Sequence, residues 1–222
     1  MSSGVRKTEY YEDARRSPNI HRLVREGFVF EQDHCERVAS HEIAFAEVLQ
    51  GREWSRRVAY PTILDYAGAG IQTNSIRNAA ALLERYQPRL VVCRETAHEA
   101  GHQGYEGYLR AARDTDIGVG RLFDWVKQHP YFSRNTAIVI RPDFGRDDEV
   151  NEHGQLHHSY GFPSTHRVAT IFWGPDFNRG VDRSTVIQAM DMAPTLARLF
   201  SVDAIHATGR VVPGLFRTGS AG

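Results

Sequence analysis

The segment 89–104, with the sequence RLVVCRETAHEAGHQG, decides the fold class of this chain. Its first part, residues 89–93, is a short aliphatic run typical of a buried β-strand. Two similar runs, 136–140 and 168–173, predict further buried strands downstream. The polar part that follows residue 93 places His98 and His102 directly behind a strand.

Helical patterns separate these strands. Residues 74–85 and 105–126 have apolar side chains at helical spacing, and Ser184 is expected to cap a third helix that runs towards residue 200. Strands that alternate with helices predict a three-layer αβα sandwich with a mostly parallel sheet. The length of 222 residues fits one domain, residues 1–222, and the ends 1–10 and 218–222 are expected to be loose.

The composition excludes several classes of protein. Lys+Arg and Asp+Glu both total 27, so no basic field attracts nucleic acid, and two cysteines are too few for a disulfide framework. No apolar run approaches the roughly 20 residues of a membrane span, and the start has no apolar signal-peptide region. The chain alone is thus expected to be soluble and cytoplasmic, or extracytoplasmic if a leader precedes it.

Chemically active side chains gather behind two of the predicted strands. His98 and His102 follow residues 89–93, and Asp143, His157 and His158 follow residues 136–140. In open parallel sheets, ligand-binding groups collect on loops at the carboxyl ends of strands. The chain has eleven histidines, and this grouping makes a metal site the first hypothesis.

His98, Glu99 and His102 match the spacing H-E-x-x-H, in which a helix presents two imidazoles to zinc and the glutamate acts as general base. This pattern raises the hypothesis of a zinc metalloprotease. Gly101, Gly104 and Gly107 oppose it, because each glycine costs about 1 kcal/mol in a helix interior. A polar loop with solvated imidazoles is the simpler alternative.

The order of several motifs resembles the alkaline phosphatase/sulfatase superfamily. The matching segments, in chain order, are 17–30 (SPNIHRLVREGFVF), 39–52, His98-Glu-Ala-Gly-His102, the strand 136–140, Asp143-Phe-Gly145, His157-His158, 172–175 (FWGP) and Asp191-Met-Ala-Pro-Thr195. They cover most of the chain. The resemblance implies an alkaline phosphatase-like fold that is N-terminally incomplete, because the family's first metal ligand is an Asp at the end of an opening strand.

The resemblance also implies a set of site residues, with departures. His102, His158, Asp143, His98 and, as an alternative to its neighbour, His157 would hold divalent metal ions (zinc, calcium, magnesium or manganese). His98 stands where the family has Asp, and Phe144 where it has His. Asp143 could instead cap a helical turn.

Ser40 lies near the family's nucleophile position, where metal coordination can activate a serine. It could equally be the N-cap of a helix over 42–49. Cys35 is a second candidate, but it does not fit the register of the sulfatase cysteine.

The function that follows from the resemblance is metal-dependent hydrolysis of phosphate or sulfate esters, with a small-molecule ester as the partner. A catalytically degenerate domain with a binding or structural role is the alternative.

Overall fold

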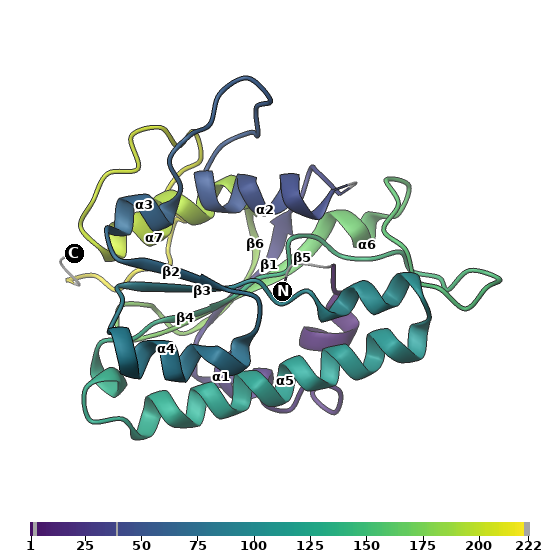
Figure 1. The fold of residues 1–222 in the computed structure, drawn as a ribbon, viewed down its shortest axis with the longest axis horizontal. Coiled ribbons are helices and arrows are strands. Elements are labelled where there is room, and N and C mark those ends of the chain that lie inside the picture. Colours follow the sequence, from purple (N-terminus) through teal and green to yellow (C-terminus); the bar gives the residue numbers. More distant parts are fainter. Residues whose placement is uncertain (2–3, 39, 220–222) are drawn as a thin grey trace.

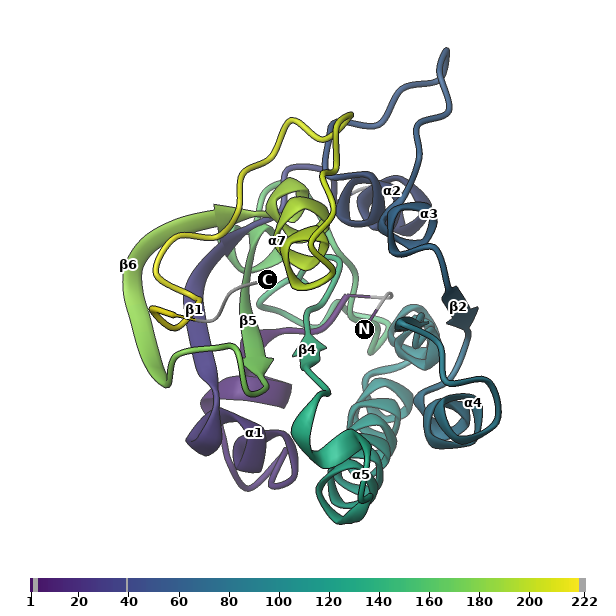
Figure 2. The same ribbon diagram turned by 90° about the vertical axis from the view of Figure 1, so that its left-hand side faces the viewer.

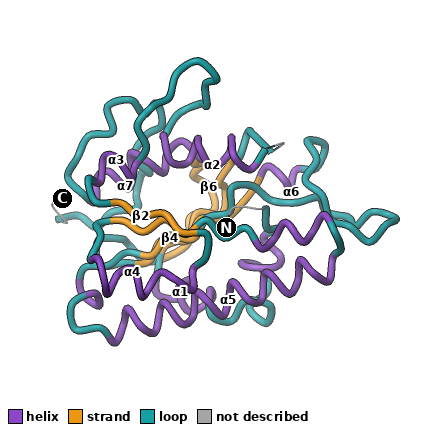
Figure 3. Tube along the Cα trace, viewed as in Figure 1, coloured by secondary structure: helices purple, strands orange, loops and turns teal. Residues whose placement is uncertain are grey.

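The computed structural model describes residues 1, 4–38 and 40–219. Strands form a middle layer with helices above and below it (Figures 1 and 3). The strands are β1 Phe28–His34, β2 Gly70–Thr73, β3 Leu90–Cys93, β4 Ile138–Ile140, β5 Arg167–Trp173 and β6 Gly180–Gln188. The α-helices are α1 Ile20–Glu26, α2 His41–Gln50, α3 Ile63–Ala67, α4 Ala79–Tyr86, α5 Tyr105–Gln128, α6 Pro163–His166 and α7 Met192–Leu199.

The helices divide between the two faces of the strand layer. In Figure 1, α2, α3 and α7 lie above the strands, and α1, α4 and α5 lie below them. Short helical turns complete the chain: η1 Thr8–Glu12, η2 Ile76–Asn78, η3 Ala97–His102, η4 Phe132–Arg134 and η5 Ala189–Asp191. The predicted αβα layering is confirmed, and so are the strands expected over 89–93, 136–140 and 168–173.

The strands form two sheets, one in the order β4-β5-β1-β6 and the other pairing β2 with β3. The β1–β6 and β2–β3 pairs are parallel, whereas β5 runs antiparallel to both β1 and β4. The expectation of a mostly parallel sheet is confirmed: in the four-stranded sheet of the described residues β4, β1 and β6 run in one direction, and β5 runs the other way. A run buried on both faces has the same composition in either direction, so its sequence could not show which way the strand runs.

The segment around Ser184 is a strand rather than a helix. Residues 180–188 form β6, which pairs with β1, and the helix that follows begins only at Met192. Val181, Thr185 and Val186 are β-branched and favour an extended backbone. The Ser184 hydroxyl bonds to the Asp182 carboxylate at 3.1 Å instead of capping a helix.

Alternate residues of the central strands enter the cores on the two faces. Val29 and Ile171 pack with α1 and α5, whereas Phe30 and Phe172 pack with α7. This alternation follows from the two-residue period of a strand.

A buried ion pair fixes the chain where it leaves β4. Arg141 donates to both carboxylate oxygens of Asp33 on β1, at 2.7 and 2.9 Å. Charges removed from water need such complete pairing, and the bidentate geometry supplies it. The loop that begins at residue 141 therefore leaves the sheet in a fixed direction.

The N-terminal segment, expected to be loose, is packed into the molecule. Val5 and Tyr10 are buried, and the Tyr10 hydroxyl donates to the carbonyl of Ala169 on β5 at 2.8 Å. Within the described part of the chain, we find no helix with the length and apolarity needed to cross a membrane.

Candidate metal centre

Three imidazoles from distant parts of the chain meet at one end of the strand layer. They belong to His41 at the start of α2, His102 at the end of η3, and His158 in the loop after β4. One ligand atom from each lies within 4.8 Å of the others. The Nε2 atoms of His102 and His158 are 3.1 Å apart. Among the described residues, this is the group of three whose spacing fits a single metal ion.

The two nitrogens of His41 have different surroundings. Its Nδ1 lies 2.7 Å from a carboxylate oxygen of Asp143, which can only accept a hydrogen bond at neutral pH. A ring proton therefore sits on Nδ1, and Nε2 is the nitrogen left for a metal. That Nε2 is buried and makes no hydrogen bond with the described residues. The stacked ring of Phe144, with its centroid 4.4 Å away, holds the imidazole in place.

His158 is oriented in the same way by the backbone. Its Nδ1 lies 2.6 Å from the carbonyl oxygen of Val38, which accepts and cannot donate. The proton of this imidazole is thus on Nδ1, and Nε2 presents a lone pair towards His102. On the other side, Nδ1 of His102 lies 2.9 Å from Nδ1 of His157. A metal on His102 Nε2 would place the ring proton on Nδ1, with His157 as its acceptor.

The surroundings keep two of these imidazoles neutral. Burial, helped by the charge of Arg146, lowers the pKa of His102 to about 4. Burial also lowers the pKa of His158. Neutral imidazole is the form that binds metal ions, so protons compete little with a metal at neutral pH.

Glu99 lies beside the open side of the group. Its two carboxylate oxygens are 3.0 Å from His41 Nε2 and 3.7 Å from His102 Nε2. The Glu99 side chain is 48% exposed, whereas that of His41 is 11% exposed. A carboxylate in this position can serve as a fourth ligand or exchange protons with solvent.

Asp143 is fixed by backbone donors, so that it can orient His41. The amides of Gly4 and Phe144 donate to its Oδ1 at 2.9 and 3.0 Å. The fully buried Arg146 ties the surrounding segments together by donating to the carbonyls of Gly4, His98 and Leu156.

The donor set fits a metal ion that prefers nitrogen. Three imidazoles with fixed rings, each with its outer nitrogen next to a second group, are the arrangement in which protein zinc sites are built. The buried Nε2 of His41 supports the fit, because among the described residues it makes no hydrogen bond and only the Glu99 carboxylate lies beside it, at 3.0 Å. Calcium and magnesium prefer oxygen ligands, which this group lacks apart from Glu99.

The residues predicted from sequence are only partly brought together. His102 and His158 belong to the group, Asp143 orients His41, and His157 contacts His102 from outside. His98 points away: it is fully buried, and its Nε2 lies 3.3 Å from the Thr115 hydroxyl in the core. His98 and His102 therefore do not share a metal, which removes the basis of the metalloprotease hypothesis.

Two candidate nucleophiles have other contacts. The Ser40 hydroxyl accepts a hydrogen bond from the amide of Ile43 at 3.4 Å, which makes Ser40 the N-cap of α2. Cys35 is buried against Arg141, and burial raises the pKa of its thiol to about 12. The thiol is thus protonated at neutral pH, which does not suit a nucleophile.

His41 was missed by the sequence reasoning. The available signal was its position in the first turn of α2, the helix that follows β1. Residues that follow a strand in this way often lie at the edge of the sheet where ligands bind. Nothing in its local spacing distinguishes it from the other scattered histidines.

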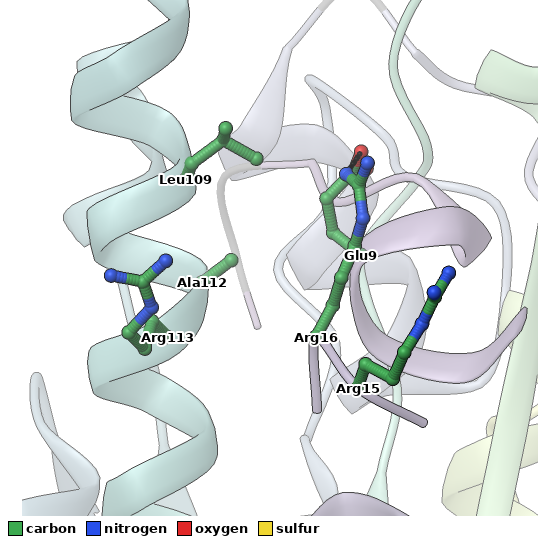
Figure 4. A pocket seen from close by; sticks show the side chains of 6 residues that line it. All are labelled: Glu9, Arg15, Arg16, Leu109, Ala112 and Arg113. Carbon is green, nitrogen blue, oxygen red and sulfur yellow. Dashed lines mark hydrogen bonds and ion pairs between the residues drawn. The ribbon is translucent and has the colours of Figure 1, made fainter. Parts of the chain in front are cut away.

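A separate cavity of about 230 Å³ lies between α5 and the η1 region (Figure 4). Arginine side chains surround it, but acidic groups already neutralise two of them. Glu9 is 3.1 Å from Arg16, and Asp13 is 3.0 Å from Arg15. We assign this cavity no function.

Neither a protein-family model nor a curated protein matches the sequence. Solved structures with a similar fold do exist. BT4656, solved in complex with its substrate D-glucosamine-2-N,6-O-disulfate, is 12% identical with a TM-score of 0.68, over 98% of this chain and 81% of that one. BT1596, a 2-O GAG sulfatase, is 12% identical with a TM-score of 0.68, over 90% and 69%.

A third similar structure is the lipoteichoic acid synthase LtaP from Listeria monocytogenes. It is 13% identical with a TM-score of 0.69, over 95% of this chain and 72% of that chain. Identities this low carry information about the fold alone. The chain therefore has the alkaline phosphatase-like αβα fold that it shares with sulfatases and with this synthase.

Proposed function

We propose that the chain is a metal-dependent hydrolase of phosphate or sulfate esters, with its reaction centre at His41, His102 and His158. The observation that carries this proposal is the convergence of three imidazoles whose outer nitrogens contact Asp143, His157 and the Val38 carbonyl. The similarity in fold to sulfatases and to a lipoteichoic acid synthase supports phosphate or sulfate esters as the substrate class.

The donor set favours zinc, or another transition metal that binds imidazole, over calcium and magnesium. A metal bound here would act as a Lewis acid on the ester oxygens and would lower the pKa of a bound water. The residues of the chain have separate tasks. The three imidazoles hold the ion, and Asp143 keeps the proton of His41 on Nδ1.

Glu99 is the best candidate for proton transfer. Its carboxylate reaches within 3.0 Å of His41 Nε2 and is about half exposed, so it can take a proton from an attacking group and release it to solvent. Ser40 remains the candidate nucleophile from sequence. Its hydroxyl also accepts from the Ile43 amide, at 3.4 Å, which leaves the second lone pair of the oxygen for attack.

The test combines metal analysis with turnover. The purified protein, loaded with Zn²⁺ or Mn²⁺, should hydrolyse an aryl phosphate or an aryl sulfate, and His41→Ala should lose this activity. His153→Ala is a matched control, since His153 is an exposed histidine outside the group. No turnover with either ester and either metal, or full turnover by His41→Ala, would reject the proposal.

A second function is favoured by one observation. Phe144 occupies a position where the resembled family has a histidine ligand, and it is fully buried against the His41 ring. With no donor atom at this position, the domain could bind one metal for assembly or ligand capture without hydrolysis. Stoichiometric metal binding without turnover of either ester would select this alternative.

A further inference from the structure

The loop between β4 and α6 contains a tight turn next to the metal centre. In Figure 1 this loop lies at the end of the molecule where α5 begins, and β4, which leads into it, packs beside α5 (Figure 2). Gly154 at the turn has a φ of 74°, which glycine adopts without strain. Its carbonyl accepts from the Tyr105 amide at 2.8 Å. The Leu156 amide donates to the carbonyl of Gly101, the neighbour of His102, at 2.9 Å.

The backbone of this turn sets the orientation of the Asn151 side chain. Its Oδ1 accepts from the amides of His153 and Gln155, at 3.0 and 2.9 Å. An amide nitrogen cannot accept, so the oxygen of Asn151 must face these donors and its Nδ2 must face the other way. That Nδ2 donates to Oε1 of Gln155 at 3.1 Å. The side chain of Gln155 is oriented in turn, because its own NH₂ group at this place would oppose the NH₂ group of Asn151.

The orientation of Gln155 fixes the ring proton of His157. Nε2 of His157 lies 3.3 Å from the same Gln155 oxygen. A carbonyl oxygen only accepts, so Nε2 carries the proton and the neutral ring keeps a lone pair on Nδ1. That Nδ1 is 2.9 Å from Nδ1 of His102. With His157 as the acceptor, the proton between the two rings belongs to Nδ1 of His102.

The consequence appears at the other nitrogen of His102. Its Nε2 keeps a lone pair, 3.1 Å from Nε2 of His158, whose own proton is directed to the Val38 carbonyl. Two lone pairs at this distance repel each other, and a cation bound by both nitrogens removes the repulsion. The reverse order of protons would place an N–H on Nε2 of His102 and donate it to His158, which would block both nitrogens for a metal.

We propose that Asn151, Gln155 and His157 are positioning residues of the metal centre. Their hydrogen bonds form a chain that begins at the backbone of the turn and holds His102 in the tautomer that binds a metal ion at Nε2. None of the three would touch the ion. The inference rests on the proposed metal centre and is independent of ester hydrolysis.

Two variants of equal charge test the order of protons. Asn151→Asp keeps an oxygen for the two backbone amides but cannot donate to Gln155. The Gln155 amide should then turn, place its NH₂ group against His157 and reverse the chain. Gln155→Glu keeps an oxygen acceptor between Asn151 and His157, so the chain keeps its order.

The two variants should therefore differ in metal binding. Asn151→Asp should weaken Zn²⁺ binding by about tenfold or more, whereas Gln155→Glu should bind Zn²⁺ at least as tightly as the unmodified protein. Each variant adds one negative charge to the same loop, so general attraction for a cation cannot produce this difference. Circular dichroism and the thermal unfolding midpoint check that both variants fold.

A second pair of variants tests His157 itself. Asn and Leu have similar size, but only Asn offers His102 an acceptor oxygen near the place of Nδ1. His157→Asn should therefore bind Zn²⁺ more tightly than His157→Leu. Nitrogen NMR of the imidazole rings gives a direct readout, because in the unmodified, Zn²⁺-loaded protein the His157 proton should be on Nε2.

The outcomes separate this proposal from the proposed function. Equal Zn²⁺ dissociation constants for Asn151→Asp and Gln155→Glu, or a His157 proton on Nδ1 in the loaded protein, would overturn the positioning chain. No Zn²⁺ binding by the unmodified protein would overturn both proposals. None of these measurements uses an ester, so Zn²⁺ binding with the expected differences but without turnover would reject the hydrolase and support the chain.

Discussion

At the scale of single residues, His41 and Asp143 act as a pair with distinct roles. His41 offers Nε2 to a metal, whereas Asp143 acts only through Nδ1, at 2.7 Å. Substituting a residue that hydrogen-bonds to a metal ligand weakens metal binding less than substituting the ligand itself. The two substitutions should therefore differ in size of effect.

We expect His41→Ala to weaken Zn²⁺ binding by more than about 100-fold, and Asp143→Asn to weaken it by about 10- to 100-fold. Competition with a chromophoric chelator measures both dissociation constants. His153→Ala should bind Zn²⁺ like the unmodified protein. Equal losses for Asp143→Asn and His41→Ala would contradict the assignment of Asp143 to an outer position.

His98 makes a prediction about stability rather than metal binding. Burial, with the charges of the N-terminus and Arg146, lowers its pKa from 6.5 to about 3 in the folded chain. Below pH 6.5 the unfolded chain takes up a proton at His98 and the folded chain does not, so acid favours unfolding. This contribution to stability is complete above pH 6.5 and is lost as the pH falls towards 3.

Between pH 7 and pH 5, the unmodified protein should lose about 2 kcal/mol more unfolding free energy than His98→Gln. Urea unfolding at both pH values measures the difference. Parallel pH dependence of the two proteins would show that His98 is protonated in the folded state.

The sequence predicts only part of the metal centre. His102, Asp143 and His158 could be named because they follow predicted strands in a recognisable order of motifs. His98 could not be separated from them by spacing, since the direction of a side chain depends on the irregular turn η3. His41 lies in the matching segment 39–52 but was not named as a ligand, and only tertiary packing shows that it reaches the site.

At the scale of elements, α2 begins with a capping serine next to a metal ligand. Ser40 satisfies the Ile43 amide, and His41 is the first helical residue. Capping uses one of the two lone pairs of this hydroxyl oxygen, so the cap alone does not decide whether Ser40 also attacks an ester. Substitutions that preserve capping but remove the hydroxyl therefore separate the two roles.

Ser40→Asn should retain the helix cap, and Ser40→Ala should cost about 1 kcal/mol of unfolding free energy. If Ser40 only caps, Ser40→Asn keeps ester turnover and Zn²⁺ affinity. Turnover that disappears in Ser40→Asn at unchanged stability and unchanged Zn²⁺ affinity would identify Ser40 as the nucleophile.

Helices and strands with a clear hydrophobic pattern were predicted correctly. Segments whose conformation depends on pairing with distant strands were not. The helix expected over 105–126 is α5, and the predicted strands are β3, β4 and β5. The composition of residues 180–188 is compatible with a helix or a strand. Pairing with β1 makes this segment a strand. The direction of β5 and the buried N-terminal segment likewise depend on distant residues.

At the scale of the whole molecule, a metal would join three distant parts of the chain: α2, η3 and the loop after β4. A ligand that binds only the folded state stabilises it by about 2.7 kcal/mol at a concentration of 100 times its dissociation constant. For a chain of this size, that corresponds to a rise of about 5 to 10 °C in the unfolding midpoint.

Calorimetry with and without Zn²⁺ should show this rise, and a chelator should reverse it. His158→Ala should show no rise at the same Zn²⁺ concentration. A metal-induced rise that persists in His158→Ala would place the bound ion elsewhere.

The long sequence separations within the metal centre have a consequence for folding studies. His102 and His158 are 56 positions apart, and His158 and Val38 are 120 apart. No short peptide contains the centre, so a coloured ion such as Co²⁺ would change its visible spectrum only when these segments have assembled. The visible absorbance of bound Co²⁺ would thus report the final stage of refolding. Helix formation within α5 could precede this stage and would not change the absorbance.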